Sequence, residues 1–299
     1  MAADKAKQNI LLGIFVMFLV TISVVITDSL YKWARVEYLS PVPYVMFARY
    51  SGVFILAIAW QVYKRNSLAT ALHTTKLKWH LFRSSALVGS TICGTLALQY
   101  TPLSIYAAVI QFAPVFVLIL LQFLPGEQLT KQQWGAVVFG LLGVMIILRP
   151  SAQGFDIHWL ISLGVVFFWG LFQALTRYLS QTESTSTLML YNMPVGLLVS
   201  VIWIAMIYRP VVMGEFWTLF SIFAISTFTF VALIVAYRLA PAKYIAPIAW
   251  LQVIWAFFPD YFIFQHRPDI FVFIGAAFII ASGVWMFLSA QKTNLQTDV

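Results

Sequence analysis

The chain has 299 residues, of which 62% are hydrophobic and 9% are charged, and its formal net charge is +8. Soluble domains are about a quarter charged, so this composition excludes a water-soluble fold and indicates a protein whose solvent is lipid. The apolar stretches leave little room for a nucleotide-binding domain, and no phosphate-binding glycine loop is present. We therefore expect no ATP-driven pump, no cofactor and no nucleic-acid partner.

Ten apolar stretches follow one another along the chain, in two sets of five. Each can form a helix of about 20 residues, the length that crosses a bilayer. The sequence therefore predicts an all-α integral membrane protein with ten transmembrane helices. The predicted spans are Leu11–Tyr31, Tyr44–Tyr63, Phe82–Tyr100, Ser104–Leu124 and Gln132–Leu148, then Trp159–Tyr178, Thr187–Tyr208, Trp217–Tyr237, Lys243–Phe264 and Asp269–Leu288.

The Lys and Arg residues predict the orientation of these spans. Most of the 18 fall in segments on the same side of the spans as the N-terminus. Cytoplasmic loops of membrane proteins carry an excess of positive charge. We therefore expect both termini in the cytoplasm, in a multi-pass protein of the cell inner membrane.

The two halves of the chain, residues 1–150 and 151–299, are predicted to be repeats. Ala97 and Pro102 match Ala236 and Pro241 at a constant offset, at which Gln111 also meets Trp250. Five spans per repeat is an odd number, so the second copy must be inverted in the membrane. Inverted repeats of this kind are typical of carriers that expose a central site alternately to each side.

Two stretches of the chain together resemble the drug/metabolite transporter superfamily, in its ten-helix EamA-type branch. Arg49 and Arg177 match arginines of the second and sixth helices of such proteins, whereas His266 stands where the second half usually repeats the acid at Glu127. The first stretch comprises Ala97–Ser104, Pro114, Pro125–Thr130, Gly135, Gly140, Gly143 and Pro150, and the second comprises Ala236–Ala242, Ala246, Pro247, Gly275 and Gly283.

This resemblance implies a secondary transporter that moves a small organic metabolite by alternating access. The subgroup it is closest to includes S-adenosylmethionine and riboflavin carriers, so the substrate stays open among an amino acid, an S-adenosylmethionine-like compound and a riboflavin-like compound. The energy source also stays open, between a proton gradient and the gradient of the substrate itself. The fifth and tenth spans share a Gly-x7-Gly pattern and have no ionic residue well inside, so we expect these helices to pack at the periphery or to support a homodimer.

Three ionisable residues are predicted to lie inside the membrane at a similar depth: Asp28, Arg49 and Asp260. Ionisable groups in lipid are costly and usually mark a function or an ion pair. In one interpretation Arg49 bridges one or both carboxylates and gates the outer end of the pathway. In the other, one carboxylate carries a proton. A structural alternative for Asp28 is an ion pair with Lys32 four residues later.

The substrate site is predicted near the middle of the membrane, where inverted repeats meet. A lone amide in a span often bonds to a neighbouring helix instead, and a lone tryptophan often only packs. The candidate binding residues are Gln111 and Pro114 of the fourth span, Trp250, Gln252 and Trp255 of the ninth, Trp169 and Gln173 of the sixth, and Asn192 of the seventh.

Other functional classes are less well supported by the residues. The four histidines lack the spacing of metal ligands, so we expect no metal site and no catalytic residue. A membrane enzyme would need converging acids or histidines at one interface, and a channel would need a polar stripe along one helix. A flippase for lipid or lipid-linked sugar on the same fold is the alternative that only a substrate test separates.

Overall fold

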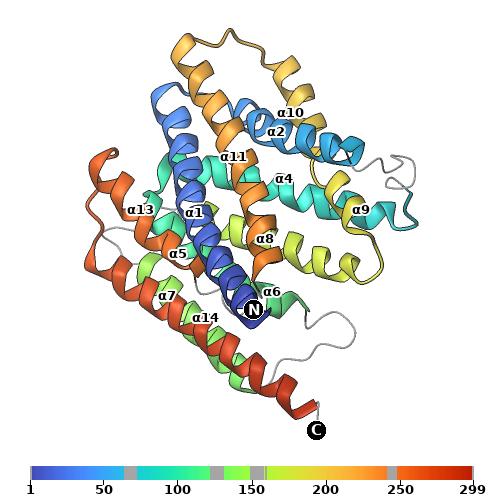
Figure 1. Ribbon diagram of the computed structural model, residues 1–299. Helices are drawn as coiled ribbons and strands as arrows, with labels where there is room; N and C mark the ends of the chain where they lie inside the picture. The colour runs from blue at the N-terminus through green and yellow to red at the C-terminus, as the bar shows by residue number, and fades with distance from the viewer. Residues whose placement is uncertain are drawn as a thin grey trace.

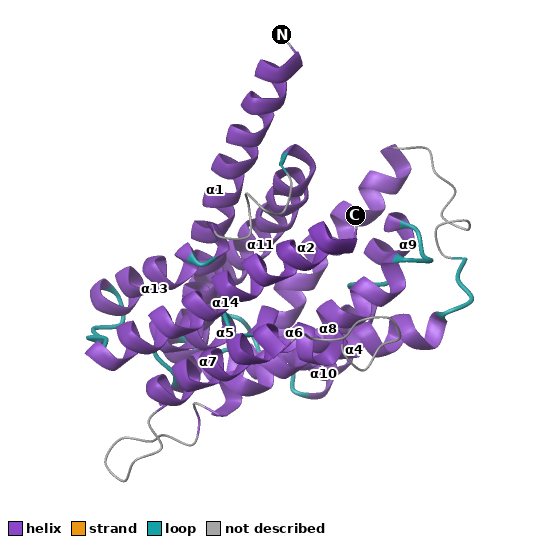
Figure 2. Ribbon diagram, turned by 90° about the horizontal axis from the view of Figure 1, so that it is seen from below, coloured by secondary structure: helices purple, strands orange, loops and turns teal. Residues whose placement is uncertain are grey.

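The computed structural model describes residues 2–63, 73–121, 131–148, 158, 160–240 and 248–297. The regular elements of these residues are helices, and none of the described residues lies in a strand (Figure 2). Seven helices are long and apolar enough to cross a membrane, and shorter apolar helices over Leu103–Val117 and Ile270–Trp285 join them. The prediction of a multi-pass, all-helical membrane protein is confirmed.

The helices run across the bundle in alternating directions, so that Ala2 at the start of the first and Thr297 at the end of the last lie on the same side (Figure 1). We call this the terminal side and the opposite one the far side. The helices are α1 Ala2–Glu37, α2 Val42–Tyr63, α4 Leu77–Tyr100, α5 Leu103–Ile110, α6 Ala113–Leu121, α7 Lys131–Leu148, α8 Leu160–Ser180, α9 Thr185–Leu190, α10 Pro194–Met206, α11 Met213–Leu239, α13 Leu251–Phe262 and α14 Ile270–Thr297.

The packing of the helices reflects two equivalent halves. If α5–α6 and α9–α10 each count as one crossing, ten crossings result, five in each half. In the repeat, α1 corresponds to α8, α4 to α11 and α6 to α13. Helix α1 packs against α11, and the corresponding helices α8 and α4 also pack together. In the same way, the contact between α6 and α8 corresponds to the contact between α13 and α1. The pairs α7 with α14 and α2 with α10 each map onto themselves. This pattern is the arrangement expected of two inverted five-helix repeats.

Two predicted spans are each divided into two helices, and a proline explains each division. The span predicted over Ser104–Leu124 breaks at Gln111 and Phe112, because Pro114 cannot donate a backbone hydrogen bond to Ile110. The amides of Gln111 and Phe112 instead donate to carbonyls three residues back. The other division, between α9 and α10, precedes Pro194, which begins α10.

The first and ninth spans also differ from their predicted bounds. Helix α1 extends to Glu37, well beyond the predicted end at Tyr31. In the ninth span, Ile248 and Ala249 are helical, the helix is interrupted at Trp250, and α13 begins at Leu251 with Trp250 as its N-cap. The segments that contain Glu127 and Pro247 lie outside the described residues.

Helices α7 and α14 form a closely packed pair at one edge of the bundle, as predicted for the fifth and tenth spans (Figure 1). Glycines allow this approach, because a Cβ atom on Gly143 would lie 2.7 Å from the carbonyl oxygen of Gly275. The Ser282 hydroxyl donates to the Ala136 carbonyl at 2.6 Å and joins the same two helices. Small residues at such contacts are the usual basis of helix association in lipid.

Gly275→Ala should destabilise this pair. The new Cβ would lie 2.4 Å from Ile147 Cγ1 and 2.6 Å from the Gly143 carbonyl oxygen, so the helices must separate. Overpacking of this kind costs about 1–3 kcal/mol, and the thermal unfolding midpoint of the detergent-solubilised protein should fall. Gly135→Ala is the matched control, because its methyl group meets only the Trp285 ring, at 3.2 Å. An equal fall in both variants would contradict the proposed packing.

Candidate functional site

The centre of the far half of the bundle contains two opposite charges, Asp28 on α1 and Arg49 on α2. Arg49 lies within electrostatic range of Asp28 and of three tyrosines, Tyr31, Tyr50 and Tyr106. Its guanidinium carbon lies 5.9 Å from the centre of the Tyr31 ring. Both charged side chains are only partly buried. The structure thus brings together two of the three ionisable residues that the sequence singled out.

Tyrosines and small polar residues surround this pair of charges. The Tyr50 hydroxyl lies 2.6 Å from the Thr91 hydroxyl on α4, which fixes its position. The Tyr31 hydroxyl lies near Ser226 of α11 and Arg49. Neither the Tyr31 hydroxyl nor the Ser226 hydroxyl has a hydrogen-bond partner among the described residues. Two buried hydroxyls therefore face the charges with unused hydrogen-bonding capacity.

Asp260 of α13 lies in a separate network on the far side. Its carboxylate accepts hydrogen bonds from the amides of Leu103 and Ser104, at 2.8 Å and 2.7 Å, and from the Ser104 hydroxyl at 2.6 Å. These amides begin α5, where unpaired N–H groups and the helix dipole favour an anion. The ammonium group of Lys32 lies 3.9 Å from the carboxylate and donates to the Thr101 carbonyl at 2.8 Å.

The partners of the three ionisable residues correct two expectations. A bridge from Arg49 to Asp260 was predicted as one alternative, but the cation beside Asp260 is Lys32. The local pair between Asp28 and Lys32 is also absent from the ion pairs of the described residues, because Lys32 turns toward α13 and the end of α4. The tertiary contact prevails over the contact along the helix because it compensates a fully buried carboxylate.

A further contact joins α1 to α4 on the far side. The Arg35 guanidinium donates to the Gln99 side chain and to the Ser40 carbonyl. With the Lys32–Asp260 network it links α1, α4, α5 and α13 above the central charges. These contacts hold four helices together on the far side of the bundle.

A polar cluster on the terminal side was not found from the sequence. Arg83 is almost fully buried and donates to the Leu188 carbonyl at 2.6 Å and to the Thr176 hydroxyl at 3.3 Å. His80, three residues earlier, lies 3.7 Å from the carboxylate of Glu183. These contacts fasten α4 to α8 and α9. The signal available was the spacing of His80 and Arg83, which places both on one face of a helix.

The breaks in the fourth and ninth spans meet at the seam between the halves. The Gln111 side-chain amide donates to the Ala249 carbonyl at 3.0 Å, just before α13 begins. Gln111 follows the last residue of α5, and Trp250, its counterpart in the repeat, precedes the first residue of α13. The two helix interruptions thus occupy equivalent positions, and Gln111 satisfies one of the carbonyls that they leave free.

The predicted tryptophans are placed differently from one another. Trp250 packs against α14, since a Cβ atom on Gly283 would lie 2.5 Å from its ring. Trp255 donates to the Thr21 hydroxyl at 3.1 Å, and Trp169 stacks on Phe172 with ring centroids 5.3 Å apart. Each ring thus has a packing or hydrogen-bonding partner within the bundle.

The remaining predicted residues are spread over several helices. Pro114 is exposed near the start of α6, and Gln173 and Gln252 are half-buried on α8 and α13. Asn192 lies at the break between α9 and α10, and its buried side-chain oxygen has no partner among the described residues. These four residues therefore lie on different elements of the bundle.

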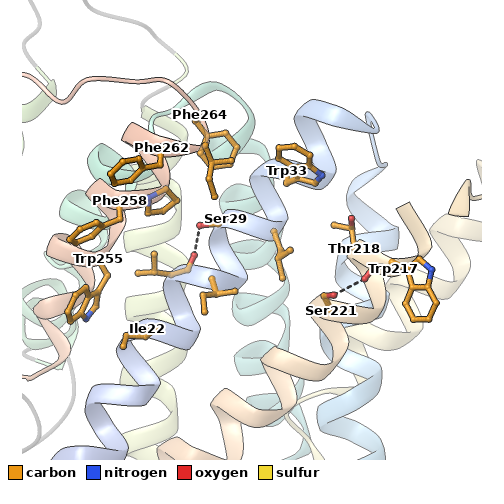
Figure 3. A pocket seen from close by; sticks show the side chains of 15 residues that line it. Ile22, Ser29, Trp33, Trp217, Thr218, Ser221, Trp255, Phe258, Phe262 and Phe264 are labelled. Atoms are coloured by element: carbon orange, nitrogen blue, oxygen red, sulfur yellow. Dashed lines mark hydrogen bonds between the residues drawn. The ribbon is translucent and has the colours of Figure 1, made fainter. Parts of the chain in front are cut away.

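A large apolar crevice of about 750 Å³ lies on the other face of α1, between α1, α11 and α13 (Figure 3). Trp33, Trp217, Trp255 and Phe258 contribute to its walls. Its hydroxyls are used within their own helices, since Ser29 donates to Val25, Ser221 to Trp217 and Thr218 to Gly214. The crevice is thus lined mostly by apolar side chains, and its hydroxyl protons are donated within their own helices.

Residues 11–149 match the sequence model of the EamA-like transporter family. The chain is 26% identical to an S-adenosylmethionine uptake transporter of Rickettsia prowazekii, with 97% of each chain covered. It is 24% identical to a riboflavin transporter of Vibrio cholerae, with 92% of this chain and 93% of the relative covered. A crystal structure with 15% sequence identity covers 96% of this chain and 99% of its own at a TM-score of 0.62, which shows a shared fold.

Asp260→Asn should destabilise the far-side network. Asparagine keeps the size but loses the charge that three donors and Lys32 share, at a cost of about 1–3 kcal/mol for buried groups left unsatisfied. The thermal unfolding midpoint in detergent should fall. The control is Glu37→Gln, which removes the charge of an exposed acid at the end of α1. A fall no larger than in this control would contradict the assignment.

Proposed function

We propose, on the premise that the chain is an EamA-type member of the drug/metabolite transporter superfamily, that it is a secondary carrier working by alternating access. It moves a small organic metabolite across the cytoplasmic membrane, and it is a carrier, not an enzyme. The observation that supports this best is the pair of partly accessible charges, Asp28 and Arg49, inside a bundle of two equivalent halves. Charges inside a membrane usually line a substrate or ion pathway.

We infer that the far side is closed in the described conformation. Lys32 and Asp260 join α1, α5 and α13, and Arg35 joins α1 to Gln99 of α4. The transport cycle must break these contacts when the far side opens. The excess of Lys and Arg on the terminal side supports placing that side in the cytoplasm, so that the closed end faces outward.

The substrate class is narrowed by the relatives named above. One set of relatives takes up S-adenosylmethionine and another carries riboflavin, so both compounds head the list of candidates. The lipid flippase is the less favoured alternative. It would use the apolar crevice beside α1, and the polar centre at Arg49 would then have no role.

Uptake into proteoliposomes should identify this carrier. Radiolabelled S-adenosylmethionine, riboflavin, amino acids and nucleosides are offered with and without an imposed pH gradient. We expect time-dependent accumulation of at least one compound above protein-free vesicles, and faster exchange when the vesicles are preloaded with the same compound. Scrambling of a fluorescent phospholipid together with no metabolite uptake would support the flippase instead.

A reversible cross-link on the far side should stop transport. In a Cys93→Ala background, Arg35→Cys and Gln99→Cys place two thiols where α1 and α4 are joined. A short, membrane-impermeant bifunctional thiosulfonate added to intact cells should abolish uptake, and a reductant should restore it.

Phe139→Cys with Phe278→Cys is the control, cross-linked with a membrane-permeant reagent, because these rings stack at 4.5 Å within the membrane-embedded α7–α14 pair. The control should keep its uptake after cross-linking, since that pair packs as a unit. Full uptake with the far side cross-linked would contradict alternating access. A reagent that acts only on inside-out vesicles would reverse the proposed orientation.

A further inference from the structure

Arg49 and Asp28 carry opposite charges toward the same interior region without forming a contact ion pair. Arg49 lies within electrostatic range of Asp28. The ion pairs within 4.0 Å among the described residues involve Lys32, His80 and Arg209, and none joins Arg49 to a carboxylate. Two opposite charges in a low-dielectric interior attract strongly, so their separation leaves an interaction that a third group can complete.

Both side chains point into the bundle. On α2, the residues one turn before and after Arg49 are Val45 and Val53, which are 0% and 4% exposed, whereas Ile55 on the opposite face is 58% exposed. On α1, Tyr31 lies one turn after Asp28 and is buried, whereas Ile26 on the other face lines the apolar crevice. Arg49 and Asp28 therefore keep some accessible surface on the sides of their helices that face the bundle.

Free hydrogen-bonding groups accompany the guanidinium. The hydroxyls of Tyr31 and Ser226 are buried and lack a partner among the described residues, and Tyr31 lies near both Ser226 and Arg49. A buried hydroxyl without a partner costs about 1–3 kcal/mol. An acceptor oxygen that enters beside Arg49 would remove this cost, and a carboxylate supplies two such oxygens.

We propose that this centre binds the zwitterionic α-amino-acid group of the substrate. The substrate carboxylate binds the Arg49 guanidinium and accepts hydrogen bonds from Tyr31 and Ser226, and the substrate ammonium binds Asp28. The proposal rests on the carrier function above and restricts it to amino acids and metabolites that carry an amino-acid group.

Charge balance favours a zwitterion over the other candidates. A simple anion would compensate the charge of Arg49 but would be repelled by Asp28. A simple cation would compensate the charge of Asp28 but would be repelled by Arg49. A neutral ring system such as that of riboflavin would displace water from both charges without replacing it, which is costly in a low-dielectric interior. A zwitterion satisfies both charges and adds no net charge to the membrane interior.

Uptake by proteoliposomes of labelled S-adenosylmethionine and of a labelled mixture of the 20 protein amino acids tests the proposal, with riboflavin as the comparator. We expect accumulation of at least one zwitterion. Excess unlabelled compound should compete, whereas its methyl ester and its deaminated analogue should not. Loss of a charged hydrogen-bond partner should raise the KM about ten- to a hundred-fold in Arg49→Gln and in Asp28→Asn.

Further variants separate binding from folding. Arg49→Lys keeps the charge but loses the paired N–H groups, so its KM should lie between those of the parent and Arg49→Gln. The double variant Asp28→Asn/Arg49→Gln leaves no unpaired buried charge, so it should fold and still fail to accumulate the zwitterion. Arg267→Gln, at an exposed loop position before α14, should keep the parent KM.

Two outcomes would overturn the proposal. One is transport of riboflavin or another compound without an amino-acid group, at a rate that Arg49→Gln leaves unchanged; the carrier function would then stand. The other is absence of accumulation of every zwitterion in the panel. The carrier function itself falls only if the wider set of metabolites also fails to accumulate.

Discussion

In hydrocarbon, every charge and every interrupted helix must find its partner inside the protein, and this constraint organises the whole bundle. Asp260 shows it most clearly. The carboxylate is fully buried on α13, yet it receives the first amides of α5 and lies beside Lys32 of α1. The Asp260 side chain thereby caps the N-terminus of α5, whose N-cap residue, Pro102, makes no side-chain hydrogen bond. It also joins helices from both halves of the chain.

The same constraint distinguishes the two spaces beside α1. In the apolar crevice, each hydroxyl of the wall donates its proton to its own helix (Figure 3). Around Arg49, the hydroxyls of Tyr31 and Ser226 have no partner, and the guanidinium has no contact ion pair among the described residues. An unsatisfied polar centre in lipid is maintained against a free-energy cost, which the polar ligand that we propose for this centre would remove.

Hydropathy predicted the spans because lipid imposes length and apolar composition on every crossing helix. It did not predict the breaks at Gln111 and Asn192, although Pro114 and Pro194 were visible in the sequence. A proline in a long apolar run either kinks a helix or divides it, and only the packing decides which. The repeat offset did place Gln111 opposite Trp250, and the structure puts the helix interruptions at these two equivalent positions.

The partners of the charged residues were less accessible from the sequence, because they depend on which helices touch. Depth alone grouped Asp28, Arg49 and Asp260, but depth does not distinguish one side of a helix from another. Helical spacing shows that Asp28 and Lys32 share a face, yet Lys32 turns to Asp260, since a fully buried carboxylate gains more from a cation than a partly accessible one. Helical spacing therefore did not predict the ion pair that Lys32 makes with another helix.

The separation of the two charged groups also bears on how transport proceeds. If Arg49 and Asp28 formed a direct ion pair, the substrate would have to displace it, and the pair would compete with the ligand in every state. Because they stay apart while Lys32 and Asp260 close the far side, the closed form keeps its polar centre available. A ligand can move the equilibrium between closed and open forms only by binding one form more tightly than the other. The contacts that the two forms make differently with Arg49 and Asp28 must therefore supply that difference, which joins recognition of the substrate to the opening of the far side.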